Sequence, residues 1–445
     1  MFPANPDNPR SKMPIKHDFE LITEVNVDAD RFCVKIDSGL KTNFFLDDFY
    51  LTMPGQELKN LPEEVLLVPF FLNVAPVIWA SGLKVTVDKM DRALFESLKR
   101  VKHALTKMYP RVDWSGDIMI RKTASTKLDL RMDSCAILFS GGLDSVASSY
   151  RHLSEKQTLV MVRGSDIALD DHVGWEVARK SAHEYATKIG ANVYFLESNF
   201  YNFLNHSRLG SLSDDIPAWW AYVQHGMGLA GMMAIPSWLD NAAIAYIAST
   251  HSDGFGDSAW GSSPKIDNEV EWCGVRVVHD GFDLTRQGKV EYIVKKAALG
   301  ADVPPLRVCY SSAGGKNCCV CEKCSRTMSG ILVSGATYQQ YGFGIPGKAF
   351  VKNTRRLFLG HRIVPDRNTL FHWGDIQAAV RDERFYVDRG LDPELIGFIG
   401  WLKRVDLQAY ARRHARYAQV KGFVKRVAAS VPGFYRFVTM IRRLR

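Results

Sequence analysis

The chain has 445 residues, 46% of them hydrophobic and 24% charged, which is typical of a globular protein with two or three domains. Its formal net charge is +9, but the segment 401–445 alone carries 12 lysines and arginines against one acid, so the other 400 residues sum to −2. Because residues 1–400 are nearly neutral, we do not expect this part of the protein to bind a long nucleic acid over its whole surface. Residues 1–14 hold no apolar stretch, so we expect no signal peptide there and a cytoplasmic protein.

Residues 15–130 are predicted to form a separate α+β unit. Apolar and polar residues alternate in 32–36 and in 83–87, which is the pattern of half-buried strands. Over residues 94–108, apolar side chains repeat at helical spacing, with Asp91 as the expected N-cap. No catalytic constellation is visible in this unit, so we expect a role in packing or in substrate recognition.

The longest uncharged window of the chain is 65–83. Its length would allow a membrane span, which makes a transmembrane helix one interpretation. Pro69, Asn73 and Pro76 interrupt the window, however. We therefore favour buried strands joined by turns.

The segment 140–145, Ser-Gly-Gly-Leu-Asp-Ser, carries the strongest functional signal of the chain. It follows the apolar run 135–139 and precedes a helical pattern at 146–152, so it predicts a strand, a glycine loop and a helix. Adjacent glycines leave backbone N–H groups bare, and these groups form a phosphate site together with the N-terminus of the helix. No Gly-Lys-Ser/Thr closes the loop, so it is not a Walker A loop.

Each residue of this glycine loop has an expected part in nucleotide binding. The two serine hydroxyls add hydrogen-bond donors, and the aspartate either orients the loop or helps to hold Mg²⁺ between protein and phosphate oxygens. A tight strand–helix turn with incidental glycines is the alternative. The expected nucleotide-binding residues are Ser140, Gly141, Gly142, Leu143, Asp144 and Ser145.

Strand and helix patterns alternate over residues 133–334, which predicts a doubly wound parallel sheet with helices on both faces. Three further strands are predicted at 159–162, 193–196 and 242–248. In such sheets, ligands bind beyond the C-terminal ends of the strands. Ser140, Arg163 and His251 each follow a predicted strand, so they can face one cleft.

Five of the eight cysteines fall within 309–324. Without a secretory signal, this clustering indicates a metal site rather than disulfides. The pattern C-x8-C-x2-C-x2-C suits a closed, structural Zn²⁺ site of four thiolates, which leaves no position for a reactive water. Lys323 and two other cations would offset the thiolate charge, and redox or persulfide chemistry is the alternative. The expected ligands are Cys309, Cys318, Cys321 and Cys324, and Cys319, out of step with them, is predicted to pack inward.

Residues 335–445 are predicted to form a helical region that ends in a basic tail. From Tyr410 to Ala428, apolar residues form a stripe among arginines and lysines, which is the pattern of a basic amphipathic helix. Such a helix can lie on an anionic membrane surface, which would place the protein at the inner face of the membrane. RNA binding and a solvated helix packed on the core are the two alternatives.

The glycine loop and the cysteine cluster, in this order, resemble the 7-cyano-7-deazaguanine synthases. These enzymes belong to the PP-loop ATP pyrophosphatase superfamily, whose S-G-G-x-D-S signature the glycine loop matches, and they carry a C-terminal four-cysteine zinc site. The resemblance covers residues 133–330. Within it, the segment 254–258 resembles the substrate segment of the family and points to Asp257, and Lys289 resembles a lysine that precedes the zinc site.

The resemblance implies an ATP-dependent, AMP-forming carbon–nitrogen ligase. In that family a carboxylate is adenylated with release of pyrophosphate, ammonia displaces AMP to give an amide, and a second ATP turns the amide into a nitrile. The resemblance implies catalytic roles for Asp144, Asp257 and Lys289, with ATP, Mg²⁺ and Zn²⁺ as cofactors. The partners would be a small carboxylate-bearing substrate and ammonia or another nitrogen donor, and we expect a homo-oligomer.

Two other functions fit the same residues. Sulfur transfer to a nucleoside or tRNA is one of them; it needs a reactive free cysteine, for which Cys135, Cys273 and Cys319 are the candidates. The other is a non-catalytic, nucleotide-binding scaffold of a polysaccharide or phage-defence cluster, docked through the basic tail. The Y-G-Q segment of the family is Arg-Gly-Ser here, at 163–165, so the acceptor stays open.

Overall fold

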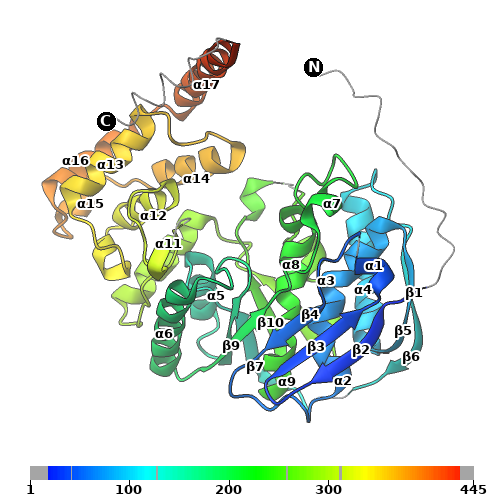
Figure 1. Ribbon diagram of the computed structural model, residues 1–445. Coiled ribbons are helices and arrows are strands. Elements are labelled where there is room, and N and C mark those ends of the chain that lie inside the picture. Colours follow the sequence, from blue (N-terminus) through cyan, green and yellow to red (C-terminus); the bar gives the residue numbers. More distant parts are fainter. Residues whose placement is uncertain (1–18, 42, 127–128, 257–258, 310–312, 431–445) are drawn as a thin grey trace.

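The computed structural model describes residues 19–41, 43–126, 129–256, 259–309 and 313–430, with the backbone alone from 422 to 430. Over these residues the chain is a mixed α/β protein with a nine-stranded sheet and a three-stranded sheet (Figure 1). The predicted class, an α/β protein with a parallel sheet and helices on both of its faces, is confirmed at this level.

Five parallel strands form the centre of the nine-stranded sheet, and the four strands predicted between residues 133 and 248 are among them. The five are β7 (Arg131–Leu138), β8 (Lys156–Arg163), β9 (Asn192–Ser198), β10 (Ala242–Ala248) and β12 (Val275–Asp280). Their apolar runs suit strands that are buried on both faces. Successive side chains of β7 enter different cores, since Ala136 packs on one face and Cys135 and Ile137 on the other.

The N-terminal strands extend this same sheet. The strands β2 (Ile22–Val27), β3 (Arg31–Ile36) and β4 (Phe49–Thr52) form an antiparallel edge that pairs with β9. With β11 (Glu271–Trp272) at the far edge, the strand order is β11-β12-β10-β7-β8-β9-β4-β3-β2. The expectation that 15–130 form a separate unit is therefore wrong, because three of its strands share the sheet and a core with the central strands.

The rest of the N-terminal segment forms the parallel sheet β1-β5-β6. Its strands are β1 (Phe19–Glu20), β5 (Lys84–Asp91) and β6 (Asp117–Ala124). The helix α4 (Arg92–Met108) packs on this sheet and begins as predicted, because the Asp91 carboxylate accepts a hydrogen bond of 2.9 Å from the main-chain N–H of Leu94.

The uncharged window is a helix and not a set of strands. The helix α3 (Val68–Ser81) is buried from Val68 to Ala80, so every side of it is covered by protein. Within α3, the Asn73 amide donates to the main-chain oxygens of Pro69 (2.8 Å) and Gly228 (3.3 Å). An all-apolar helix shows no 3.6-residue period, which is why its sequence does not distinguish it from strands. In the described part of the chain, no helix is long and apolar enough to cross a membrane.

Helices cover both faces of the central strands. One face carries α5 (Leu143–Arg151) and α6 (His172–Ile189), and the other carries α8 (His225–Gly231) and α9 (Ala234–Leu239). A π-helical turn at Trp220–Gln224 leads into α8. Four short helices complete the N-terminal two thirds: α1 (Ser38–Lys41), α2 (Glu63–Leu66), α7 (His206–Gly210) and α10 (Pro264–Asp267).

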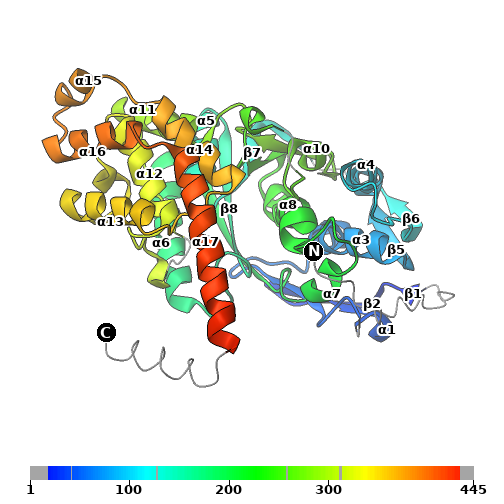
Figure 2. The same ribbon diagram turned by 90° about the horizontal axis from the view of Figure 1, so that it is seen from above.

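The C-terminal residues form a helical region, as the sequence predicts. From residue 335 on it contains α13 (Gly347–Leu359), α14 (Arg367–Ala378), α15 (Glu383–Val387) and α16 (Pro393–Lys403). These helices pack on α11 (Arg286–Ala298) and α12 (Glu322–Val333), which precede the predicted region. The last helix, α17 (Leu407–Ser430), starts against this region, where the buried Tyr410 donates to the main-chain oxygen of Ile363 at 2.8 Å. Residues 415–421 are exposed, and the helix projects away from the others (Figures 1 and 2). Residues 431–445 of the predicted tail lie outside the described residues.

Candidate nucleotide site and metal centre

The glycine loop joins the end of β7 to the start of α5, as predicted. Gly141 has a φ of +71°, a left-handed conformation that favours glycine and turns the chain sharply after the strand. The Ser145 hydroxyl donates to the main-chain oxygen of Gly142 (3.1 Å), and the Gly142 N–H donates to the Ser140 hydroxyl (3.3 Å), so the two serines brace the loop. The N–H groups of the first two residues of α5 donate to no described residue, which leaves them for a ligand.

A cavity of about 400 Å³ opens at this loop. Ile247 and Ala248 from the end of β10 and His225 from α8 form part of its wall. Its position beyond the C-terminal ends of parallel strands is the usual ligand position in such a sheet, and its volume falls within the range of small-molecule sites. The charged side chains that line the cavity are Asp144, Asp166, Arg286, Arg307 and Lys323.

Asp144 is held between two cations. Its Oδ2 accepts a hydrogen bond of 2.7 Å from Arg286, and its Oδ1 lies 3.4 Å from Nζ of Lys289. Lys289 is buried and also donates to the main-chain oxygen of Ser249. Burial acts to raise the pKa of Asp144, but the positive charges around it, that of Arg286 first, outweigh burial and lower the pKa to about 2. The carboxylate is therefore ionised, and both of its oxygens are engaged in orienting the site.

Cations outnumber carboxylates around the cavity. Arg286, Arg307 and Lys323 line it, and the described acids that line it are Asp144 and the exposed Asp166. Burial lowers the pKa of Arg307 and of Lys323, because both cations lie where water solvates them poorly. An excess of positive charge in such a place strongly favours an anionic ligand.

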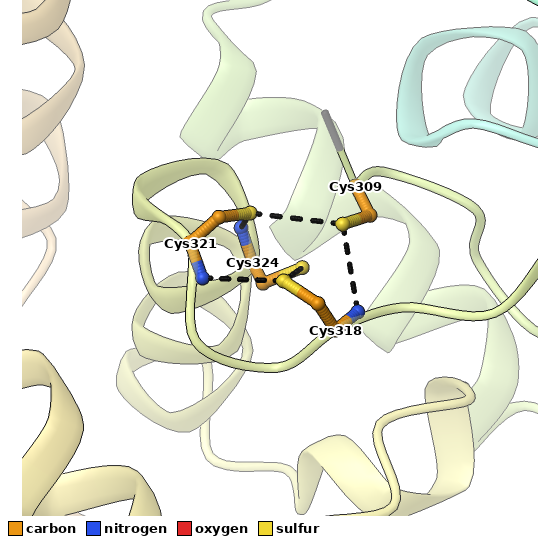
Figure 3. A group of neighbouring side chains, drawn as sticks. All are labelled: Cys309, Cys318, Cys321 and Cys324. Atoms are coloured by element: carbon orange, nitrogen blue, oxygen red, sulfur yellow. Dashed lines mark hydrogen bonds between the residues drawn. The ribbon is translucent and has the colours of Figure 1, made fainter. Parts of the chain in front are cut away.

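The four predicted metal ligands converge, as Figure 3 shows. The sulfurs of Cys309, Cys318, Cys321 and Cys324 all lie within 4.8 Å of one another. The Cys309 and Cys321 sulfurs are 3.8 Å apart, and the Cys318 and Cys324 sulfurs are 4.0 Å apart. A tetrahedron with metal–sulfur bonds of about 2.3 Å has edges of about 3.8 Å. The four cysteines can therefore hold a metal ion such as zinc.

Main-chain donors shape this cluster. The Cys321 sulfur caps α12 by accepting from the N–H of Cys324 (3.5 Å), and the Cys318 sulfur accepts from the N–H of Cys321 (3.3 Å). Such bonds stabilise negative charge on sulfur. Cys319 is buried, has a φ of +58° and donates to the main-chain oxygen of Asn317 (3.5 Å). It packs inward, as predicted.

The cysteine cluster and the cavity share residues. Cys309 is both a member of the cluster and part of the cavity wall. Lys323 stands between Cys321 and Cys324 in the sequence and also lines the cavity. Arg307 lies two residues before Cys309 and also lines the cavity. A metal ion that fixes the cysteines would therefore also fix two cations beside the glycine loop.

Two of the three predicted catalytic residues meet at the glycine loop. Asp144 and Lys289 form the ion pair described above. Asp257 lies outside the described residues. Arg163, expected at the same cleft, does not line the cavity; it is buried, pairs with Glu197 at 3.3 Å and donates to main-chain oxygens of the loop that follows β8.

Sequence reasoning missed three cavity residues. Arg286 stands three positions before Lys289 at the start of α11, a spacing that places both side chains on one helix face. This spacing in the sequence could have indicated that Arg286 lies beside Lys289. Arg307 and Asp166 lie in loops without a motif, and only the folded chain brings them to the cavity.

Comparisons of the chain with protein-family models, with curated proteins and with solved structures find no match.

Proposed function

We propose that the protein is an ATP-dependent ligase that adenylates a carboxylate on a small molecule, with release of pyrophosphate, and then passes nitrogen to it with release of AMP. The observation that carries this proposal is the cavity at the glycine loop, where free helix N–H groups and the cations Arg286, Arg307 and Lys323 meet in a space of about 400 Å³. A triphosphate needs such a concentration of donors and positive charge. The S-G-G-x-D-S sequence of the loop supports cleavage between the α- and β-phosphates.

Adenylation requires stabilisation of the charge that builds up on the departing pyrophosphate. The loop N–H groups and the three cations of the cavity are held in place before any reaction, so they stabilise that charge without reorganisation. Asp144 keeps Arg286 and Lys289 in position through its two ion pairs. When bound, Mg²⁺ would add positive charge at the phosphate oxygens, and Asp166 is a carboxylate at the cavity that could help to hold it. Asp257 remains the predicted substrate-binding residue.

We propose zinc as the metal of the cysteine cluster. Four thiolates around one ion suit Zn²⁺ and leave no position for a reactive water, so its role would be structural. It would keep Arg307 and Lys323 at the cavity. Metal analysis of the purified full-length chain should give about one zinc per chain. A metal-free chain that binds ATP with undiminished affinity would contradict this role.

The test of the ligase function is the release of pyrophosphate that depends on an acid. The full-length chain is incubated with ATP, Mg²⁺, ammonium chloride and a panel of small carboxylates, and pyrophosphate is measured as phosphate after pyrophosphatase treatment. We expect release with one class of acid, and faster release with more ammonium. ATP binding without turnover on any acid would instead indicate the nucleotide-binding scaffold.

A matched pair of variants shows whether the release comes from this site. Asp144→Asn should lower it by about 100-fold or more, because the preorganised charges of the loop are lost. Asp88→Asn is the same chemical change on a side chain that is 86% exposed, and it should leave the release unchanged.

The cysteines outside the cluster give little support to sulfur transfer. Cys135, Cys273 and Cys319 are buried, and burial raises the pKa of each thiol. Burial also raises the pKa of Cys33, in β3. The thiolate is the reactive form of cysteine, so thiols that stay protonated are poor nucleophiles. Nitrogen transfer is therefore the favoured chemistry.

A further inference from the structure

Asp267 and His279 form a buried hydrogen-bonded pair, and His279 is the register neighbour of Ile247, which lines the cavity. Asp267 ends α10 and is fully buried, and His279, next to last in β12, is 7% exposed. The Nδ1 of His279 donates to Oδ2 of Asp267 at 2.7 Å, and the Ser262 hydroxyl donates to the same oxygen at 2.8 Å. The main-chain N–H of His279 donates to the Asn268 side chain at 2.8 Å. The imidazole ring and the carboxylate are thus fixed relative to each other.

This pairing selects one form of the imidazole. Because Nδ1 donates its hydrogen to a carboxylate, the neutral ring carries its lone pair on Nε2. Within the described residues, Nε2 of His279 makes no hydrogen bond. The carboxylate behind Nδ1 also fixes the orientation of the ring, so that Nε2 is the ring atom left to take up a proton. The pair is therefore built to accept a proton.

The pair lies at the same end of the sheet as the glycine loop. His279 stands beside Ile247 in the register of β12 and β10, and Ile247 lines the cavity. The next residue, Asp280, bonds to α5 on the opposite face of the sheet, so His279 lies on the face covered by α8. His225 of α8 lines the cavity and interacts electrostatically with both Asp267 and His279.

A further histidine connects the pair to the glycine loop. His251, which follows β10, interacts electrostatically with His279 and with Asp144. Its ring stacks on Phe255 with centroids 4.7 Å apart and packs edge-on against Trp260 at 5.7 Å. These rings follow the C-terminal end of β10, the strand end at which the cavity opens.

We propose that Nε2 of His279 accepts the proton of the nitrogen nucleophile that attacks the acyl adenylate, with Asp267 as its positioning residue. This inference rests on the proposed ligase function and names the proton acceptor of its second step. Ammonium gives one proton to Nε2, and the lone pair so freed forms the C–N bond. The C–O bond to AMP breaks and leaves its electron pair on AMP, and the second proton lost by nitrogen passes to water.

The other basic groups described near the loop are less suited to this role. Lys289 is engaged by the Asp144 carboxylate and by a main-chain oxygen. His225 lines the cavity, but its buried Nδ1 has no partner among the described residues, so no carboxylate selects its tautomer. Only His279, among the described histidines on this face, combines a carboxylate behind Nδ1 with an unengaged Nε2.

The test compares two nitrogen nucleophiles. At neutral pH hydroxylamine is largely unprotonated and attacks without a proton acceptor, whereas ammonium must first lose a proton. With the carboxylate that supports AMP release, full-length His279→Gln should lose about 100-fold in amide formation from ammonium but only about threefold in hydroxamate formation from hydroxylamine. Asp267→Asn should show the same discrimination to a smaller degree, because Nε2 remains while the ring loses its fixed orientation.

His152→Gln is the matched control. His152 is also a partly buried histidine that pairs with a carboxylate, at 2.5 Å from Glu155, but it belongs to the opposite face of the sheet. The His152→Gln variant should change the rate of amide formation from ammonium and the rate of hydroxamate formation from hydroxylamine by the same factor. An equal loss with both nucleophiles in His279→Gln, or an undiminished rate with ammonium, would overturn the inference alone. A wild-type chain that forms no AMP with any carboxylate would overturn the ligase function, and the inference with it.

Discussion

The main-chain N–H of Arg307 donates a hydrogen bond of 2.8 Å to the main-chain oxygen of Gly141. The guanidinium of the same arginine donates to the main-chain oxygen of Ser140 at 3.2 Å. These bonds tie the segment that enters the cysteine cluster to the turn of the glycine loop. Two sites that are far apart in the sequence are thus one structural unit. A substitution in the cysteine cluster should therefore change the conformation of the glycine loop.

Replacing Cys318 with serine should therefore weaken both metal binding and ATP binding. A hydroxyl is a poor substitute for a thiolate in such a site, and loss of the metal would release Arg307 and Lys323 from their positions. We expect little bound zinc and an ATP dissociation constant that is raised about tenfold or more. Metal analysis and isothermal titration calorimetry measure the two effects.

Cys319→Ser is the control for this experiment. Cys319 lies in the same segment as the cluster but is not one of its four members. The variant should keep its zinc and its affinity for ATP. A zinc-free Cys318→Ser chain with wild-type affinity for ATP would show that the cluster and the loop are not coupled.

Asp144 should make the stability of the fold sensitive to acid. Its pKa is lowered from 3.8 to about 2, so the folded state favours the ionised form. The resulting stabilisation is complete above the ordinary pKa and is lost as the pH falls toward about 2, a loss of about 2 kcal/mol. Between about pH 5 and about pH 2.5, urea unfolding of the wild type should lose about 1.5 kcal/mol more than that of Asp144→Asn. Equal losses in the two chains would contradict the ion pairs.

Asn73 should contribute strongly to the stability of α3. Its amide donates to two main-chain oxygens, and its Oδ1 accepts from the Gln224 side chain at 2.6 Å. Asn73→Ala would remove three buried hydrogen bonds, while the Gln224 amide would keep its bond of 2.9 Å to the main-chain oxygen of Phe200. The free energy of unfolding should therefore fall by about 2–4 kcal/mol. Urea unfolding followed by tryptophan fluorescence measures the change. Asn202→Ala, at an exposed position, should cost less than about 0.5 kcal/mol. A similarly small cost at Asn73 would contradict the buried network.

The basic tail should bind anionic membranes without taking part in catalysis. Residues 415–421 of α17 are exposed, and ten of the twelve cations of 401–445 lie in 412–445. Deletion of 412–445 should lower co-sedimentation with phosphatidylserine vesicles by about tenfold or more, because each lost cation weakens the attraction. AMP formation should persist, since the buried Tyr410 is retained.

Neutral vesicles and single-stranded RNA serve as comparisons for the tail. Unchanged binding to anionic vesicles in the deleted chain, or tail-dependent binding of RNA alone, would contradict the membrane interpretation. Simultaneous loss of AMP formation would show that the tail is part of the catalytic fold.

Much of the central fold follows from local patterns. Buried parallel strands are short apolar runs, and the Asp91 cap and the glycine loop depend on a few consecutive residues. The partner of a strand is not a local property. The alternation in β3 predicts a strand correctly, but nothing in it says that this edge joins β9 through the pairing of Leu51 in β4 with Ser198. That pairing is decided by which apolar faces meet when the whole chain folds.

The candidate site was predictable to the same extent. The spacing of the cysteines predicted the metal ligands, and the glycine loop predicted the position of the phosphate site. Arg307, Asp166 and the pair formed by Asp267 and His279 carried none, because each lies in a stretch without a motif and acquires its surroundings only from tertiary contacts.

The proposed ligase must cut ATP between its α- and β-phosphates. The most direct test is to incubate ATP labelled at the α-phosphate with the full-length chain, Mg²⁺, ammonium and the active carboxylate, and to separate the nucleotides. We expect the label in AMP, in an amount equal to the pyrophosphate released. Label in ADP, with release of phosphate from the outer end of the nucleotide, would contradict it.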